Sequence, residues 1–588
     1  MTRITRPAAV PVLIFAGLVV ATFAAFFVTT RLKRSAPVIE QLTFRRSFSP
    51  NGDGRFDTAL FALRLRRSDD VTVSIVKRGG DEVRTLAEDV SLSKRRRYRF
   101  RWDGRNDAGR RARDGEYNLR VGLRRQGRTV TSPRKLFLDT VPPRPVVRSV
   151  SPDSISPDGA GEASSAKVRF AGPTRRTRLL VYRTDLRPPR LVAVKRIPRG
   201  HSTVRWDGIV KGGPAPTGAY LLVVRAQDAA GNVGPAEVPP PRGRVRGHPG
   251  LAVTYVSART HVADAGGTAR FDVSADGRRY RWHVRRLGSS RVVDRGSSRA
   301  ASIVARVPSG RSGVALLSVR VGSHRYTTPF VVRGERRRRV LVVLPATTWQ
   351  ARNPLEVNGD GYPDVLPEDR RVSARRPFAH DGMPPGFVPD QSGVLRYLDR
   401  ERLRYDLTTD LALSSGAAAS ALDRYTGILF AGAPRFASYG VEALLRIYLR
   451  GGGRVAWIGR RGFEWSVRTV GSRELTSPRR ALAARFGERV RLEPEPVPVA
   501  VLTDSIRFFA GVPGAFGPFG PLEESLRLPR GAVLLASAGT GGARPSVVVY
   551  RRGEGVAARI GIDGFGRALG TSPDAARIMR RLWVLLSR

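Results

Sequence analysis

The chain has 588 residues, too many for a single hydrophobic core, so we expect several domains. It contains no cysteine, which excludes disulfides, thiolate metal sites and cysteine nucleophiles. The net charge of +53 is carried almost wholly by arginine and would suit an anionic partner such as a nucleic acid, lipid headgroups or a cell-wall polymer. Because basic residues occur in every segment, we favour a general arginine enrichment and expect no specific nucleic-acid partner.

Residues 8–30 form an uncharged apolar run longer than the ~20 residues that a helix needs to span a bilayer. A cleaved signal peptide is the alternative, but its apolar core would be shorter and a small-x-small cleavage site would follow. Here Phe26–Val28 and a basic cluster occupy that position. We therefore predict an uncleaved transmembrane anchor over residues 1–34, with the membrane as a partner. The protein would be a single-pass protein of the cell membrane with its bulk outside the cytoplasm.

Residues 40–240 contain an internal repeat of roughly 100 residues. Each unit has a Ser-Pro turn, a Trp-Asp-Gly turn and a Gly-x-Tyr sequence in the same order, at residues 48–54, 101–104 and 115–117 and again at 156–159, 205–208 and 218–220. Short strands between closely spaced turns predict β-sandwiches at 38–142 and 143–241. The pattern resembles the immunoglobulin-like domain of the flagellar hook-capping protein family, which implies a spacer or adhesion module.

A third β region follows at residues 248–333, after the proline-rich linker Pro239–Pro241. Segments such as Ala269–Val273 and Val314–Val321 alternate or run apolar, with turns between them. We predict a third, smaller sandwich here.

The last domain is predicted to cover residues 338–588, and its clearest part is the stretch 425–466. Gly427–Gly432 and Arg454–Gly459 read as buried strands that flank a helix, because their apolar runs are short and the residues between them recur at helical spacing. Strands that alternate with helices predict an α/β doubly wound, mostly parallel sheet.

Ligands of such sheets bind at the carboxyl ends of the strands. We therefore place a ligand site at Arg435, Arg460, Arg461 and Gly462, where the cations suit a small anionic ligand or an anionic polymer of the cell envelope.

The last domain looks like the C-terminal domain of the N,N-dimethylformamidase large-subunit family. The matching residues are LPATTWQARN at 344–353, GGGR at 451–454 and GRRGFEW at 459–465. The resemblance implies a fold related to class I glutamine amidotransferases, activity on amide C–N bonds, and an iron site with an H-x-E-Y-like motif after the strand Gly427–Gly432. This chain has A-P-R-F-A at 433–437, so the carboxylate and the phenol are replaced by groups that do not bind iron.

Candidates for catalysis are few. The last domain has one histidine, His380, and a serine hydrolase would have to pair it with Ser438 or Ser466, which nothing in the sequence brings together. We therefore expect a membrane-anchored binding or scaffold protein that presents a non-catalytic domain on immunoglobulin-like spacers. The alternatives are an amide hydrolase with a rebuilt metal site of Glu356, Asp360 and Asp364, and an arginine-driven binder of anionic envelope polymers.

One further motif, N-G-D-G-x-x-D, occurs twice. Oxygen side chains at alternate positions resemble the first half of a calcium loop, with Asn51, Asp53 and Asp57 in the first copy and Glu356, Asn358, Asp360 and Asp364 in the second. Neither copy has the bidentate glutamate of a complete loop. The pattern leaves two interpretations open: a turn whose side chains cap backbone amides, and a calcium site, which the pattern favours more in the second copy than in the first.

Overall fold

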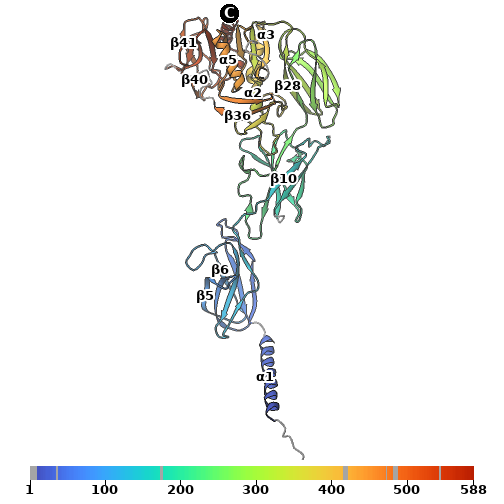
Figure 1. The fold of residues 1–588 in the computed structure, drawn as a ribbon, viewed down its shortest axis with the longest axis vertical. Helices are drawn as coiled ribbons and strands as arrows, with labels where there is room; N and C mark the ends of the chain where they lie inside the picture. The colour runs from blue at the N-terminus through green and yellow to red at the C-terminus, as the bar shows by residue number, and fades with distance from the viewer. Residues whose placement is uncertain are drawn as a thin grey trace, which may run out of the picture. The chain divides into compact units, whose positions relative to one another are not determined.

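The computed structural model describes residues 9–34, 38–159, 161–172, 176–414, 422–471, 473–480, 488–541 and 544–588 (Figure 1). The chain forms two compact units. Unit 1 consists of Met1–Arg144 and Ala226–Ala236, and unit 2 of Pro145–Arg225 and Glu237–Arg588.

The N-terminal helix α1 covers Ala9–Arg34, and residues 1–8 of the predicted anchor lie outside the described residues. Within the described part of the chain, no helix is both long and apolar enough to cross a membrane. The predictions of a membrane anchor, a membrane partner and a single-pass location are therefore wrong.

Unit 1 contains two sheets whose inward side chains share one core. The first has the order β1 (Ile39–Phe44), β3 (Ala59–Leu65), β6 (Arg97–Trp102). The second has the order β2 (Ser47–Phe48), β9 (Leu136–Leu138), β7 (Gly115–Leu123), β4 (Asp69–Lys77), β5 (Glu82–Leu92), and β8 (Arg128–Thr131) also pairs with β7. Trp102 is 1% exposed and its ring lies 5.0 Å from that of Tyr117, so the Trp-Asp-Gly turn serves the core.

The downstream segment 226–236 completes unit 1. It folds as a hairpin in which β19 (Val233–Gly234) pairs with the end of β18 (Gly218–Gln227). Asn232 is 1% exposed; it accepts a hydrogen bond from the Ser49 hydroxyl (2.6 Å) and donates one to the Asp139 carbonyl (2.8 Å).

Unit 2 begins with two further pairs of sheets, each pair around its own core. The first pair has the orders β10 (Val146–Ser151), β12 (Ala166–Ala171), β15 (Thr203–Trp206) and β11 (Ser154–Ile155), β20 (Gly250–Val253), β18, β13 (Thr177–Arg183), β14 (Arg190–Ile197), with a small hairpin of β16 (Ile209–Val210) and β17 (Gly213–Pro214). The second has the orders β21 (Ser257–Arg259), β23 (Thr268–Ser274), β26 (Ser302–Arg306) and β22 (Ala263–Asp264), β28 (His324–Arg333), β27 (Gly313–Val321), β24 (Tyr280–Arg286), β25 (Val292–Ser298).

The C-terminal part of unit 2 is built on a nine-stranded sheet. Its order is β31 (Asp406–Thr409), β29 (Val340–Leu344), β32 (Gly427–Phe430), β34 (Arg454–Ile458), β43 (Gly555–Ile560), β42 (Pro545–Arg552), β41 (Ala532–Gly539), β38 (Val499–Asp504), β39 (Ala515–Phe516). The pairings from β31 to β43 are parallel, and those from β43 to β39 are antiparallel.

The predicted α/β doubly wound domain is therefore wrong. Half of the large sheet is antiparallel, the described chain is dominated by strands, and the arrangement gives no support to the predicted likeness to glutamine amidotransferases. The physical reason is the short connections within the second half, since β42 and β43 are joined by two residues, which only an antiparallel turn can accommodate.

Smaller elements surround the sheet. The additional strands form the sheets β30 (Arg371–Ser373), β36 (Glu474–Arg480), β35 (Trp465–Val470), β33 (Phe436–Ser438) and β37 (Arg489–Glu493), β40 (Leu522–Arg527). The helices are α2 (Ala346–Ala351), the π-helix η1 (Phe387–Gln391), α3 (Ser392–Arg400), α4 (Asp410–Ser414), α5 (Tyr439–Arg450), α6 (Phe565–Ala568) and α7 (Pro573–Ser587).

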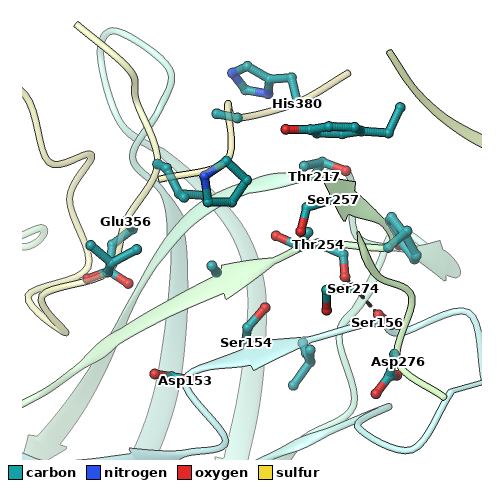
Figure 2. Close-up of a pocket in the computed structure, with 18 of the residues that line it drawn as sticks. Asp153, Ser154, Ser156, Thr217, Thr254, Ser257, Ser274, Asp276, Glu356 and His380 are labelled. Carbon is teal, nitrogen blue, oxygen red and sulfur yellow. Dashed lines mark hydrogen bonds between the residues drawn. The ribbon is translucent and has the colours of Figure 1, made fainter. Parts of the chain in front are cut away.

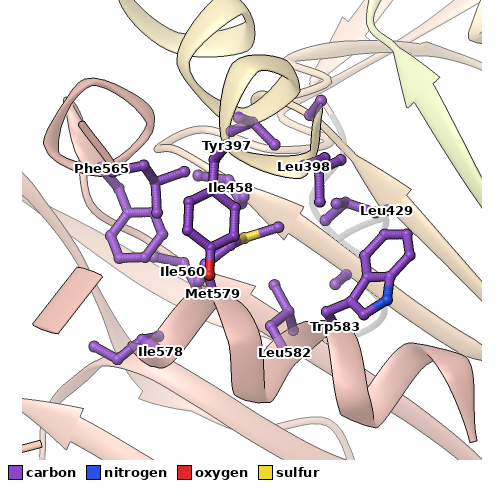
Figure 3. Close-up of a cluster of buried hydrophobic side chains, with 14 of the residues drawn as sticks. Tyr397, Leu398, Leu429, Ile458, Ile560, Phe565, Ile578, Met579, Leu582 and Trp583 are labelled. Atoms are coloured by element: carbon purple, nitrogen blue, oxygen red, sulfur yellow. The ribbon is translucent and has the colours of Figure 1, made fainter. Parts of the chain in front are cut away.

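Helices cover both faces of the parallel strands, which explains why those strands are apolar on both sides. On one face, α7 packs its buried side chains against the sheet, with Leu582 and Met579 close to Leu429 and Ile458 (Figure 3). On the other face, α5 contributes buried side chains to a second core. The helices leave the carboxyl ends of these strands to the loops described next.

Candidate functional site: an arginine-lined cavity

A cavity of about 630 Å³ lies at the carboxyl ends of the parallel strands. Its walls follow the strands in turn: Thr348, Trp349 and Arg352 follow β29, Ala433 and Arg435 follow β32, Gly459, Arg460 and Arg461 follow β34, and Asp563, Gly564 and Arg567 follow β43. The remaining wall includes Asp390 and Gln391 at the end of η1. The segments that follow four neighbouring parallel strands therefore lie together around this cavity.

Five arginines line this cavity, and the sequence predicted three of them. Arg435, Arg460 and Arg461 all lie in its wall. Arg352 and Arg567 were not predicted, although Arg352 stands within the motif at 344–353 and directly follows a strand and a short helix. The predicted Gly462 is absent from the described lining; it lies under Trp457, whose ring a Cβ at this position would approach to 2.6 Å.

The three predicted arginines are held in ion pairs. Arg435 Nε donates to Glu464 Oε2 (2.6 Å), and Arg461 Nη1 lies 3.4 Å from the same carboxylate, which is 5% exposed. Arg460 donates to Asp563 (2.7 Å). The backbone amides of Arg460 and Arg461 are also engaged, by Asp563 and by Glu523. Two carboxylates thus compensate part of the charge of these three side chains.

Arg352 and Arg567 differ, because neither guanidinium forms an ion pair with a residue that the structure describes. Loss of solvent lowers the pKa of Arg352, and the neighbouring positive charges of Arg435 and Arg461 lower it further. Asp563 and Asp390 oppose this lowering of the pKa, but neither forms an ion pair with Arg352.

Acceptor groups lie in the wall formed by η1. Burial raises the pKa of Asp390 to about 6, the negative charge of Asp563 adds to the rise, and Arg567 and Arg352 oppose it. Gln391 is 4% exposed, and its side-chain oxygen has no hydrogen-bond partner. Both donors and acceptors thus border the cavity.

Glu356 and His380 lie in a different pocket of about 330 Å³ (Figure 2). Serine and threonine side chains from the two sandwiches of unit 2 line part of the rest, and the Ser156 hydroxyl donates to the Thr254 carbonyl (2.7 Å). His380 has φ 58° and its Nε2 lies 4.0 Å from Asp185 Oδ2.

The candidate serines do not join His380. Ser438 is the N-cap of α5 and accepts from the Val441 amide (3.2 Å), and Ser466 donates to Glu442 Oε1 (2.6 Å). They lie on the adjacent strands β33 and β35, and no hydrogen bond links either to His380. The structure assembles no Ser-His pair from these residues.

In the second N-G-D-G loop, side-chain oxygens accept hydrogen bonds from backbone amides. Glu356 accepts from Gly359 (2.6 Å), Asn358 from Asp360 (2.8 Å), Asp360 from Tyr362 (2.7 Å) and Asp364 from Val357 (2.6 Å). In the first copy, Asn51 accepts from Asp53 (3.0 Å), Asp53 from Arg55 (2.8 Å), and Asp57 from Gly52 and Gly54 (both 2.8 Å). These are the contacts of capping turns.

Among the described residues, no group of three or more His, Asp or Glu side chains could hold a metal ion. Burial raises the pKa of Glu356 to about 7 and that of Asp364 to about 6, and like charges nearby add to both shifts. Calcium at either loop stays a prediction.

Comparison with known families identifies two parts of the chain. Residues 300–498 match the family described as N,N-dimethylformamidase beta subunit-like, C-terminal, and residues 53–127 match the FlgD Ig-like domain. The chain carries both domains. This confirms the two resemblances, although the N,N-dimethylformamidase-like match begins within the third sandwich and ends before β38.

Solved structures are only weakly similar. A beta-galactosidase from Rahnella sp. R3 is 14% identical over 32% of this chain and 26% of its own, with a TM-score of 0.23. Salmonella alpha-2-macroglobulin reacted with methylamine is 12% identical over 50% of this chain and 23% of its own (TM-score 0.19), and the human OSCAR ligand-binding domain is 16% identical over 34% of this chain and 94% of its own (TM-score 0.20). The chain thus spans about a quarter of each of the first two. A comparison with curated proteins finds no match.

The iron site implied by the N,N-dimethylformamidase resemblance does not fit residues 433–437. Arg435 donates a hydrogen bond to Glu464, and Phe436 is fully buried with its ring stacked 6.1 Å from that of Trp465. Neither position supplies an oxygen or imidazole ligand, so we derive no step through iron at this place.

Proposed function

We propose that the N,N-dimethylformamidase-like domain binds a small anionic ligand in the arginine-lined cavity without catalysing a reaction, and that the Ig-like domains act as spacers. The observation that carries the proposal is Arg352, a cavity arginine that forms no ion pair with any described residue. It stands close enough to Arg435 and Arg461 for their charges to lower its pKa.

Electrostatics favours an anion at this point. Glu464 and Asp563 set two negative charges against the three positive charges of Arg435, Arg460 and Arg461, and Arg352 and Arg567 add positive charge that forms no ion pair with a described residue. Hydrogen bonds to charged groups contribute roughly 1.5–3 kcal/mol each, and a carboxylate can accept two from one guanidinium. An anion beside Arg352 would also relieve its repulsion with its neighbours.

The test is calorimetric titration of the full chain with glutarate, a dicarboxylate that fits easily in a cavity of this size. We expect Arg352→Gln to weaken glutarate binding by about 10-fold or more, equivalent to ~1.4 kcal/mol. The matched control is Arg551→Gln, because Arg551 is exposed and pairs with Val556 near the start of β43, at the end of that strand away from the cavity. Equal affinity in the parent chain and in Arg352→Gln would overturn the proposal.

A second candidate function is amide hydrolysis, which the match of residues 300–498 to the N,N-dimethylformamidase beta subunit-like family favours. Amide hydrolysis requires an activated nucleophile and a proton donor. Among the described residues that line the cavity, the carboxyl groups are Asp390, whose pKa burial raises to about 6, and Asp563, which is paired with Arg460. We expect no turnover of N,N-dimethylformamide by the full chain, with or without added Fe²⁺. Turnover that is lost in Asp390→Asn would establish the hydrolase in its place, and turnover lost in Asp360→Ala or Asp364→Ala would establish the rebuilt metal site.

A further inference from the structure

Two buried polar side chains that border the cavity lack hydrogen-bond partners. The indole Nε1 of Trp349 is a donor and the side-chain oxygen of Gln391 is an acceptor; the residues are 5% and 4% exposed. Most buried polar groups in proteins are hydrogen-bonded, and a ligand in this cavity would supply the partners that these two groups lack; Trp349 also lines a second pocket of about 410 Å³.

The two groups belong to elements in direct contact. Trp349 lies in α2 and Gln391 ends η1, and the Trp349 ring meets that of Phe387 in η1 edge to face at 5.8 Å. The relative position of these two groups is therefore fixed by packing rather than by a loose loop.

Each of these two groups has a charged residue beside it: the donor Trp349 has a cation, and the acceptor Gln391 has an anion. Arg352 follows Trp349 by three residues, so this side of the cavity offers N–H donors and a positive charge. Asp390 precedes Gln391, so the η1 side offers oxygen acceptors and a carboxylate. The Asp390 carboxylate forms no ion pair and accepts no hydrogen bond from any described residue, yet it lies within electrostatic range of Arg352.

A simple anion would satisfy only one of these sides. Acetate can accept from Trp349 and Arg352 but has no donor for Gln391; phosphate keeps an O–H donor near neutral pH, but its charge, like that of acetate, is repelled by Asp390. A group with several N–H donors and a positive charge would satisfy both acceptors, and an ammonium is the smallest such group.

We propose that the ligand is a zwitterion of the α-amino acid class, with its carboxylate at Trp349 and Arg352 and its ammonium at Asp390 and Gln391. This inference rests on the proposed function, because it assumes that the arginine-lined cavity binds an anion. Since Arg567 leaves a further positive charge without an ion pair, an amino acid with a second carboxylate matches the cavity best.

The experiment compares L-glutamate with glutarate, which share a carbon chain and two carboxylates and differ only in the α-ammonium group. In calorimetric titrations of the full chain, we expect glutamate to bind at least ~10-fold more tightly than glutarate. Asp390→Asn is expected to abolish this preference while glutarate binding persists or tightens, because the variant removes both the partner of the ammonium and a carboxylate that repels anions. Asp423→Asn is the control, since Asp423 is exposed and precedes β32, at the end of the strand away from the cavity.

The outcomes separate the two proposals. Equal affinity for glutamate and glutarate in the parent chain would overturn the zwitterion and leave the anion site intact. A preference for glutamate that survives in Asp390→Asn would also overturn it, because the ammonium would then be recognised elsewhere. Failure of both compounds to bind would overturn the proposed function and this inference with it.

Discussion

At the scale of single residues, Asp410 is the clearest case of a carboxyl group held where water cannot reach it. Its side chain is fully buried, Oδ1 accepts from the Thr347 amide at 2.9 Å, and Oδ2 has no partner. Burial raises the pKa of Asp410 to about 7, although backbone hydrogen bonds near α2 and α4 oppose the rise. The folded protein therefore holds this proton more tightly than the unfolded chain does.

This residue predicts a pH dependence of stability. The unfolded pKa of an aspartate is ~3.9, so the contribution of Asp410 is present in full below about pH 4 and is lost as the pH rises to about 7. The free energy of unfolding should fall across that window by at most ~1.4 kcal/mol per pH unit from this group. Urea denaturation at about pH 5 and about pH 7 should show a smaller fall in Asp410→Asn than in the parent chain.

Glu356, Asp364 and Asp390 also have raised pKa values and act in the same direction, so the fall should become smaller in Asp410→Asn rather than disappear. The exposed Asp423→Asn is the matched control and should leave the pH dependence as in the parent. An identical fall in Asp410→Asn and the parent would contradict the assignment.

Some residues of the cavity could be predicted from the sequence, and others could not. Arg435, Arg460 and Arg461 were predictable, because each follows an apolar run that reads as a buried strand, and strand ends bring such residues together. Asp390 and Gln391 could not be predicted. They are the last residues of a π-helix that follows a proline-rich loop, and no periodicity in the sequence indicates that this segment lies at the strand ends.

At the scale of elements, the strands of the C-terminal sheet were easier to predict than their directions. The apolar runs of β41, β42 and β43 mark them as strands, but an apolar run is the same in a parallel and an antiparallel neighbour. Direction follows from the connections, and the two residues between β42 and β43 leave no room for a crossover. The parallel half was predictable because a helix separates β32 from β34.

Helix α7 allows a test of whether its packing against the parallel strands stabilises the protein. Ser572 caps its first turn by accepting from the Ala575 amide, and Leu582 is fully buried against the parallel strands (Figure 3). We expect Leu582→Ala to lower the free energy of unfolding by about 2–5 kcal/mol, because it leaves a cavity in the core. Chemical denaturation measures this loss.

Val584 gives the control on the same helix, since it is 36% exposed and its truncation to alanine should cost much less. Comparable losses for Leu582→Ala and Val584→Ala would mean that α7 does not pack on the sheet as described.

At the scale of the whole molecule, the charge of +53 remains the dominant property outside the cavity. Basic residues lie on every domain, so binding to an extended polyanion should depend on their total rather than on any one cluster.

We expect polyphosphate to bind and its affinity to fall steeply as salt increases. Replacing the exposed residues Arg95, Arg96 and Arg97 with glutamine removes three of 103 basic residues, so affinity and its salt dependence should change only slightly. A titration of the full chain at several salt concentrations measures both. A collapse of binding in this variant would instead locate a specific polyanion site at β6.

The hairpin at 226–236 has a consequence for how this protein can be rearranged in evolution. Ser49 and Asp139 rely on Asn232 as a hydrogen-bond partner, and Gly231, with φ 106°, sits where a Cβ would strike the Phe56 ring. A gene fragment that stops at residue 144 would thus encode a first Ig-like domain that lacks the hairpin 226–236 and its hydrogen bonds to Ser49 and Asp139. Recombination that moves this domain intact would have to carry residues 226–236 with it.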